Sequence, residues 1–195
     1  GMSGGPSVRL QREIAACAKD AEISGVNVLT VGDSLTHLRG TIQGPKDSPY
    51  EGGVFHVDIH IGDQYPFAPP KMQFITKVWH PNVSSQTGAI CLDILKDQWS
   101  PALTIKTALL SIQALLTAAE PDDPQDAEVA RMYKSDPALF AETARQWTQL
   151  YAKETSDDEK VKSLTAMGFA ESAVRAALAR SGGDTEAAAE ILLSS

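Results

Sequence analysis

The stretch VFHVDIHI, residues 54–61, decides the fold of the first part of the chain. Apolar residues occupy every second position in it: Phe55, Val57, Ile59 and Ile61. This alternation predicts a β-strand with one buried face and one face in water. His56 and His60 stand at polar positions, so we expect them to face solvent and not to bind a metal.

Segments with a similar alternation lie on both sides of this strand. Two precede it, at 26–30 and 38–42, one follows at 72–76, and turn-rich segments separate them. The pattern predicts an antiparallel four-stranded meander. Before the sheet, apolar residues recur every three or four positions over 8–21, which predicts a helix. The expected fold class is therefore α+β, with an N-terminal helix before the sheet and further helices after it.

Helices are also predicted downstream. Apolar residues over 105–116 follow the spacing of a core helix. Asp123 and Asp136 are each followed by a proline, as at a helix start with an acidic N-cap, so we expect a helix to begin at each. Between the sheet and these helices, residues 79–103 show no period, and a long irregular stretch in a compact domain is usually functional.

The composition changes near the C-terminus, at the run KETSDDEK. A polar and acidic run of this kind indicates a linker. We expect a first domain at 1–153, a linker at 154–157 and a second domain at 158–195. Three short helical patterns in the second domain, with Gly182 and Gly183 as a helix stop, predict a three-helix bundle with a small core.

Composition and charge exclude several classes of protein. The chain has 195 residues, 43% hydrophobic and 22% charged, as is ordinary for a soluble protein. Its net charge of -8 argues against binding to nucleic acid or anionic membranes, which requires a positive surface. No stretch approaches the length of a membrane span, and the opening GMSGGPS lacks the features of a secretory signal. We expect a monomer in the cytoplasm, with the nucleus as a second location.

Two cysteines are present, Cys17 and Cys91, without a Cys-X-X-Cys pair or a nearby cluster of histidines and cysteines. The sequence therefore predicts neither a zinc site nor a disulfide framework. Cys17 lies on the apolar face of the first predicted helix, where a buried packing role is expected. Cys91 follows GAI inside the irregular stretch, and it is either a packing residue or a nucleophile.

The residues near Cys91 leave two kinds of chemistry open. A cysteine hydrolase needs a base to form the thiolate. The nearest histidine, His80, belongs to the tight tripeptide HPN, where it could equally brace the backbone. Transfer of an activated acyl group needs instead an oxyanion donor and an acid that orients or deprotonates an amine. Asn82 is the candidate donor, and Asp123 or Asp93 is the candidate acid.

Several motifs occur together over residues 6–152: YEGGVF, YPFAPP, HPN, GAICLDIL, QWSPALT and AEPDDP. In this order and spacing they resemble the core (UBC) domain of ubiquitin-conjugating enzymes. The tail, about 157–195, resembles a ubiquitin-associated (UBA) domain through Met-Gly-Phe at 167–169 and Leu-Leu at 192–193. The resemblance implies an α+β UBC core followed by a three-helix UBA domain.

The resemblance also implies a reaction. Cys91 would accept the C-terminal carboxyl group of ubiquitin from the ubiquitin-activating enzyme as a thioester, and pass it to a lysine amine or to a ligase. ATP is used upstream by the activating enzyme, so no cofactor is expected. Asn82 matches the family residue that stabilises the oxyanion or holds the active-site loop. Asp123 matches the acid that orients or deprotonates the incoming lysine, whereas Asp93 is expected in a solvated loop.

Further residues match the binding surfaces of the family. Ligases of the RING and HECT kinds would bind two loops that contain Phe67, Ser100, Pro101 and Ala102. Leu110 matches a contact with the ubiquitin held in the thioester. The UBA residues expected to bind ubiquitin are Met167, Gly168, Phe169, Leu192 and Leu193.

Three functions from different classes compete: an active ubiquitin carrier, an inactive relative that only binds ubiquitin, and a cysteine hydrolase. The intact set of Cys91, Asn82 and Asp123 favours the carrier. Because a UBA domain would hold a ubiquitin nearby, we expect polyubiquitin chains built through one preferred lysine. The sequence does not specify that lysine, the ligases or the substrates.

Overall fold

The computed structural model describes residues 6–154 and 156–195. Along the chain, its helices and strands are α1 (Pro6–Lys19), α2 (Ala21–Ser24), β1 (Val26–Val31), β2 (Ser34–Gln43), β3 (Val54–His60), β4 (Lys71–Phe74), the 3₁₀ helix η1 (Asp93–Leu95), α3 (Ile105–Leu115), α4 (Ala127–Ser135), α5 (Pro137–Tyr151), α6 (Asp157–Thr165), α7 (Glu171–Arg180) and α8 (Thr185–Ser194).

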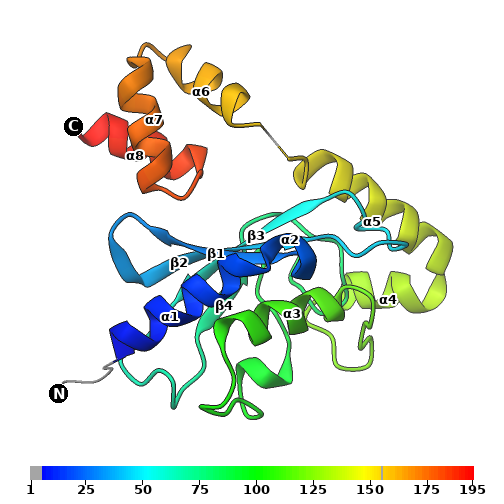
Figure 1. The fold of residues 1–195 in the computed structure, drawn as a ribbon. Coiled ribbons are helices and arrows are strands. Elements are labelled where there is room, and N and C mark those ends of the chain that lie inside the picture. The colour runs from blue at the N-terminus through cyan, green and yellow to red at the C-terminus, as the bar shows by residue number, and fades with distance from the viewer. Residues whose placement is uncertain (1–5, 155) are drawn as a thin grey trace.

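The four strands form one antiparallel sheet in the order β1-β2-β3-β4, which confirms the predicted meander and α+β class. Helices α1 and α3 pack on one face of the sheet, and the second domain lies beside the other (Figure 1). We call these the inner and outer faces. The alternation in β3 explains why α1 and α3 cover the inner face, since Phe55, Val57 and Ile59 point inward and are fully buried.

Helix α3 approaches the inner face closely. Its residues Leu109 and Ile112 are fully buried, and each such side chain contributes roughly 1.5–3 kcal/mol on burial. Gly40 of β2 makes the approach possible, because a Cβ atom at that position would lie 2.7 Å from Cδ2 of Leu109. The helix thereby fixes the chain that precedes and follows it, which includes the irregular stretch.

One predicted helix start is confirmed and the other is wrong. The side chain of Asp136 caps α5, with proline in the first turn, as predicted. Asp123 caps no helix: α4 begins at Ala127, and its N-cap is Asp126, whose side chain accepts a hydrogen bond from Val129. The reason is a competing acceptor, since the N–H groups of residues 125 and 126 both donate to the carbonyl of residue 81 and hold this segment as a turn.

The second domain is a bundle of α6, α7 and α8 around its own apolar core, as predicted. Gly182 and Gly183 both have positive φ (66° and 85°) and end α7, and Asp184 caps α8. The predicted linker at 154–157 includes Thr155, which lies outside the described residues. Within the described residues, no helix has the length and apolar character needed to cross a bilayer.

Among the described residues, hydrogen bonds join the bundle to the outer face of the sheet and to the turn between β1 and β2. Arg39 of β2 donates to the carboxylate of Asp184 over 2.5 Å, and both side chains are largely buried. The N–H group of Gly32 donates to the carbonyl of Arg180. The bundle therefore lies against β1 and β2, on the face opposite α3 (Figure 1).

Candidate active site

Cys91 lies at the end of a short strand-like segment. Its predecessor Ile90 forms an isolated antiparallel bridge with Val83, and the N–H of Cys91 donates to the carbonyl of Asn82 over 2.9 Å. The chain then turns into η1. These backbone bonds hold the thiol beside the HPN segment, and the side chain is only partly buried. Cys17, in contrast, is fully buried on α1, as predicted.

His80 braces the backbone and does not act on the thiol. Its ring is fully buried: Nε2 donates to the carbonyl of Leu115 over 2.7 Å, and Nδ1 accepts the N–H of Asn82 over 3.0 Å. Burial lowers the pKa of His80 to about 4, although the bond to Leu115 opposes this change. The imidazole is therefore neutral at physiological pH, and its two nitrogens tie the HPN segment to the end of α3.

Asn82 holds the loop that contains Asp123. Its buried Nδ2 atom donates to the carbonyls of Glu120 and Asp123 over 3.0 and 2.9 Å, and its Oδ1 atom accepts the N–H of Glu120 over 2.8 Å. All three bonds reach across 38 or more residues of sequence. The side-chain amide thus anchors residues 120–123 beside the thiol.

Two charged groups contact the sulfur. The carboxylate of Asp123 lies 3.6 Å from Sγ of Cys91, and the ammonium of Lys96 lies 3.8 Å from it. Burial raises the pKa of the thiol above its ordinary value of 9.0; Lys96 lowers this pKa and Asp123 raises it. The thiol is consequently protonated at neutral pH. Sequence reasoning missed Lys96, and its position five residues after the cysteine was the one available signal.

The thiol opens onto a cavity of about 410 Å³ between η1, α3 and the loop before α4. Its lining residues are Asn82, Cys91, Leu92, Asp93, Ser111, Ala114, Leu115, Ala118, Glu120 and Asp123. Asp93 is exposed, as expected, but it is the first residue of η1 and not part of a loop; its carboxylate accepts the N–H of Ile94. Because three of the lining residues are acidic, the cavity favours a cationic group such as a lysine ammonium.

The two loops predicted to bind ligases lie next to each other. The indole N–H of Trp99 donates to the carbonyl of Pro66 over 2.8 Å, which joins the loop after β3 to the loop before α3. Phe67 is 79% exposed beside this bond. The other three predicted residues form an adjoining turn, in which Ser100 Oγ accepts the N–H of Ala102, and Pro101 and Ala102 are exposed.

A groove of about 440 Å³ runs between α1 and the loop before α3. Arg9 crosses it and donates to the carbonyls of Pro101 and Leu103 over 2.8 and 2.9 Å. Glu13 accepts hydrogen bonds from Tyr65 and from the N–H of Ile105. Both α1 residues thereby support the predicted ligase-binding loop, a role that sequence reasoning did not assign to them.

On α3, Leu110 is half-buried whereas Leu109 is fully buried. The periodicity of the helix explains the difference, because Leu109 points at the sheet and Leu110 lies one position round the helix. Part of the Leu110 side chain therefore remains available to a partner, as its match to a donor-ubiquitin contact requires.

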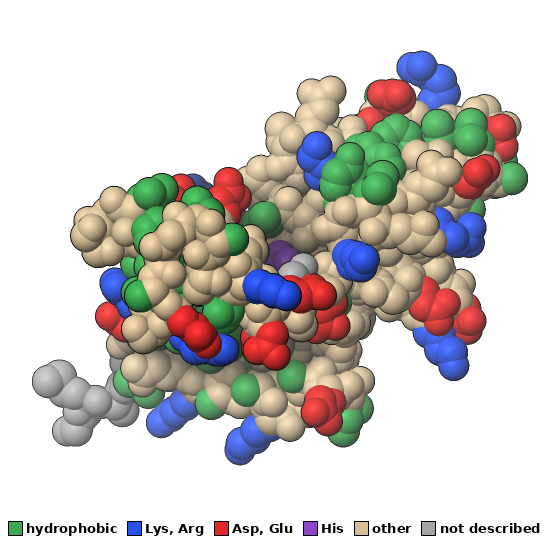
Figure 2. Space-filling view, turned by 90° about the horizontal axis from the view of Figure 1, so that it is seen from above, with side chains coloured by type: hydrophobic (Ala, Val, Ile, Leu, Met, Phe, Trp, Pro, Cys, Tyr) green, Lys and Arg blue, Asp and Glu red, His purple; other side chains and the backbone are tan. Residues whose placement is uncertain are grey.

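In the second domain, the predicted ubiquitin-binding residues divide by burial. Met167 is 59% exposed and Leu193 is 70% exposed, and Gly168 has a φ of 100° at the turn between α6 and α7. Phe169 is half-buried against the bundle. Leu192 is only 8% exposed, so this residue belongs to the bundle core and is not available as a contact. Figure 2 shows hydrophobic side chains exposed over this domain, at the left.

Comparison with protein-family models gives two matches. The model described as "Ubiquitin-conjugating enzyme" matches residues 9–148, and the model described as "UBA/TS-N domain" matches residues 156–192. Both families are those that the motifs predict.

Curated relatives match almost the whole chain. Ubiquitin-conjugating enzyme E2 27 of Arabidopsis thaliana is 59% identical over 186 residues, which cover 95% of this chain and 97% of the relative. Ubiquitin-conjugating enzyme E2 K of Homo sapiens is 53% identical over 192 residues, 95% of this chain and 96% of the relative. The order of the two domains also predicts similarity to the huntingtin-interacting ubiquitin-conjugating enzyme, which the match to E2 K confirms.

Solved structures match the first domain. The E2 domain of a Toxoplasma gondii ubiquitin-conjugating enzyme is 54% identical, with a TM-score of 0.73, and the match covers 76% of this chain and all of the other. A ubiquitin-conjugating enzyme from Plasmodium yoelii is 51% identical, with a TM-score of 0.74 and 79% of this chain covered.

Proposed function

Because the chain belongs to the ubiquitin-conjugating enzyme family, we propose that Cys91 is the residue on which it carries ubiquitin. The observation that supports this assignment is the setting of the thiol. It opens onto an acidic cavity, contacts Asp123 and Lys96, and has no hydrogen bond with a histidine among the described residues. Such a thiol suits exchange with an already activated thioester better than hydrolysis of a peptide bond.

The proposed reaction has two transfers. In the first, the Cys91 thiol loses its proton to water, and the thiolate attacks the thioester carbonyl that the activating enzyme presents. A new C–S bond forms, and the cysteine of the activating enzyme leaves as its thiolate and takes up a proton from water. In the second, a lysine amine attacks the new thioester, an amide bond forms, and the sulfur of Cys91 leaves and regains a proton. The nearby Lys96 ammonium stabilises negative charge on this sulfur in both steps.

Asp123 acts in the second transfer. Its carboxylate lies 3.6 Å from the sulfur and lines the same cavity. It attracts the protonated lysine, orients the amine toward the thioester and accepts its proton. Asp93 and Glu120 add negative charge to the cavity without contacting the sulfur.

Asn82 is a positioning residue in this proposal. Its amide makes three hydrogen bonds to the backbone of residues 120–123, so both of its N–H hydrogens are already engaged. This arrangement supports the loop-holding role over oxyanion stabilisation. Asn82 fixes Asp123 at the distance from the sulfur that the second transfer requires.

Ligases bind the surface made by Phe67, Ser100, Pro101 and Ala102, and Trp99 holds its two halves together. A surface centred on one exposed aromatic residue and flanked by proline is typical of a small docking site. The ubiquitin in the thioester rests against Leu110 of α3, which is half-buried.

The UBA domain, proposed at 158–195, binds a second ubiquitin through Met167, Gly168, Phe169 and Leu193. Weak binding of that ubiquitin raises its concentration near Cys91, which favours polyubiquitin chains over single additions. Titration of ubiquitin into Leu193→Ala should show clearly weaker binding with an intact bundle. Leu192→Ala should instead unfold the bundle. If the folded Leu193→Ala protein bound ubiquitin as tightly as the parent does, the proposed ubiquitin-binding surface would be wrong.

A single-turnover charging assay tests the carrier assignment. The protein, activating enzyme, ubiquitin and ATP are mixed and separated with and without reducing agent. The parent should form an adduct that reduction removes, and Cys91→Ala should form none. If the folded parent forms no adduct, the protein is a binding module. If Cys91→Ala forms the same reducible adduct, Cys91 is not the carrier.

A further inference from the structure

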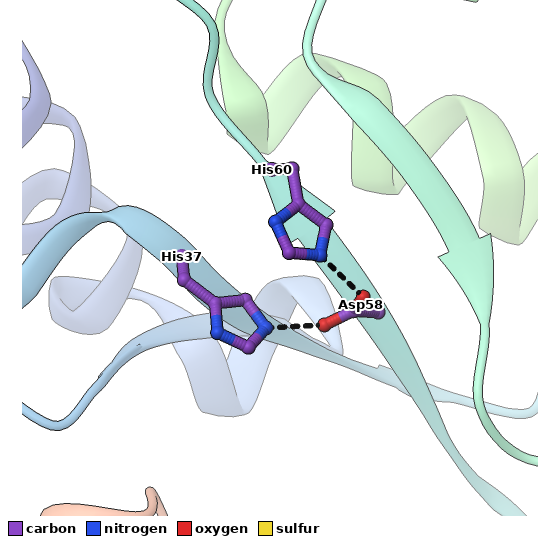
Figure 3. A group of neighbouring side chains, drawn as sticks. All are labelled: His37, Asp58 and His60. Atoms are coloured by element: carbon purple, nitrogen blue, oxygen red, sulfur yellow. Dashed lines mark hydrogen bonds and ion pairs between the residues drawn. The ribbon is translucent and has the colours of Figure 1, made fainter.

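The outer face of the sheet brings three side chains together, away from the thiol cavity. His37 of β2 lies directly opposite His60 of β3 in the antiparallel register, and Asp58 precedes His60 by two residues on the same face. All three come from neighbouring strands and point to one spot (Figure 3).

The two imidazoles converge on one carboxylate. Nε2 of His37 lies 2.6 Å from Oδ1 of Asp58, and Nε2 of His60 lies 2.8 Å from Oδ2 (Figure 3). The rings are stacked, with centroids 4.4 Å apart and planes inclined by 9°. Within residues 6–154 and 156–195, this is the only set of three histidine, cysteine or acidic residues whose candidate ligand atoms all lie within 4.8 Å of one another.

We propose that His37, Asp58 and His60 form a binding site for one Zn²⁺ ion. Two imidazole nitrogens and one carboxylate oxygen are a donor set that zinc takes in proteins, at bond lengths of about 2.0–2.2 Å. A tetrahedral ion at these lengths holds its donors about 3.3 Å apart. The present N–O distances are shorter, so the side chains must rotate slightly apart to admit the ion.

The three side chains can take the form that binds a cation. Zinc binds the lone pair of a neutral imidazole, so the proton on each Nε2 must move to Nδ1 by a change of tautomer. All three side chains are partly exposed, which leaves the fourth coordination position to water.

Two cationic residues stand next to the proposed site. Arg39 lies opposite Asp58 in the register, but its guanidinium is bound to Asp184 of the second domain, which offsets its charge. Lys71 lies opposite His60 in β4. Its ammonium repels a bound cation, so Lys71→Ala should bind zinc several-fold more tightly than the parent.

Zinc titration by calorimetry, with Co²⁺ absorption as a spectroscopic readout, tests the site. The full chain carries Cys91→Ala, because the thiol and its acidic neighbours are a competing site. One equivalent should bind, and His37→Asn, His60→Asn and Asp58→Asn should each weaken binding at least tenfold. His56→Asn is the matched control, on the same strand and face but outside the cluster, and should bind as the parent does.

Thermal unfolding supplies the second readout. Zinc should raise the melting temperature of the Cys91→Ala protein. It should not change the melting temperature of a variant that also carries His37→Asn and His60→Asn, because only bound metal stabilises the folded state. The melting temperature without zinc shows that each variant is folded. The proposal is overturned if the Cys91→Ala protein shows no saturable zinc binding, or if the variant that also carries His37→Asn and His60→Asn binds zinc equally well. It is also overturned if His56→Asn weakens zinc binding as much as His60→Asn does.

Discussion

The thiol cavity and the outer face of the sheet use histidine in opposite ways. Beside the thiol, His80 is fully buried, and both of its nitrogens are bonded to backbone groups. On the outer face, His37 and His60 are partly exposed, and each directs Nε2 at the carboxylate of Asp58. The histidine nearest to Cys91 in sequence thus holds the backbone, whereas the two distant ones have the geometry of ligands. The contacts of the ring nitrogens decide the role.

The largest effect that separates the two regions is on stability. His80→Ala leaves the carbonyl of Leu115 and the N–H of Asn82 without partners, each at about 1–3 kcal/mol, so the free energy of unfolding should fall by about 3 kcal/mol or more. His60→Ala, in a partly exposed pair, should cost less than about 1 kcal/mol. Urea denaturation followed by tryptophan fluorescence measures both, since all three tryptophans lie in the first domain. Equal losses of unfolding free energy in the two variants would contradict the different roles assigned to His80 and His60.

The next effect is the pH dependence of that stability. The folded pKa of His80 is about 4, below its ordinary 6.5, so the unfolded chain binds more protons between these values. Stability contributed by neutral His80 is therefore complete above pH 6.5 and lost as the pH falls toward 4, by roughly 3 kcal/mol. Denaturation at several pH values should show this decline.

A His80→Gln protein is the control for this decline, because glutamine does not titrate. Its free energy of unfolding should change less between pH 6.5 and 4. Burial also lowers the pKa of His56 below 6.5, so His56 contributes to the decline in parent and variant alike, and the difference between the two proteins reports His80. The lowered pKa values of Asp58 and Asp126 lie below 3.8 and act at lower pH. An identical slope in parent and variant would show that His80 does not carry the dependence.

A smaller effect concerns the reactivity of the thiol. Asp123→Asn removes a negative charge 3.6 Å from the sulfur, which should lower the pKa of Cys91 and speed alkylation roughly two- to tenfold at neutral pH. Lys96→Ala should slow alkylation by a similar factor. His37→Asn, on the other face of the sheet, should leave the rate unchanged. Iodoacetamide kinetics, corrected with Cys91→Ala, measure these rates; a slower Asp123→Asn protein would contradict the assigned electrostatics.

Much of the fold followed from sequence pattern, because alternation in β3 and periodicity in α3 report burial directly. The motifs also predicted the family and the neighbourhood of Cys91. The hydrogen-bond competition at Pro81, which moved the start of α4 to Ala127, left no trace in local sequence.

Local sequence patterns also did not predict contacts between distant residues. The approach of His37 to His60 depends on strand register, which the hairpin turn sets and which alternation alone leaves open. Leu192 and Leu193 are adjacent and equally apolar; the helical spacing of Ala188 and Leu192 favours burial of Leu192, whereas the family motif names both as contacts, and the structure agrees with the spacing. Periodicity reports which face is apolar, and it does not identify the partner across that face.

Discharge of the ubiquitin thioester onto free lysine tests the proposed mechanism most directly. The parent and Asp123→Asn are first charged to the same extent, the activating enzyme is then stopped, and loss of the thioester is followed with time. We expect Asp123→Asn to charge normally and to discharge about 10²-fold more slowly, since the carboxylate acts on the incoming amine. Equal discharge rates would contradict the role of Asp123 and, with it, the reason for Asn82 to hold the loop.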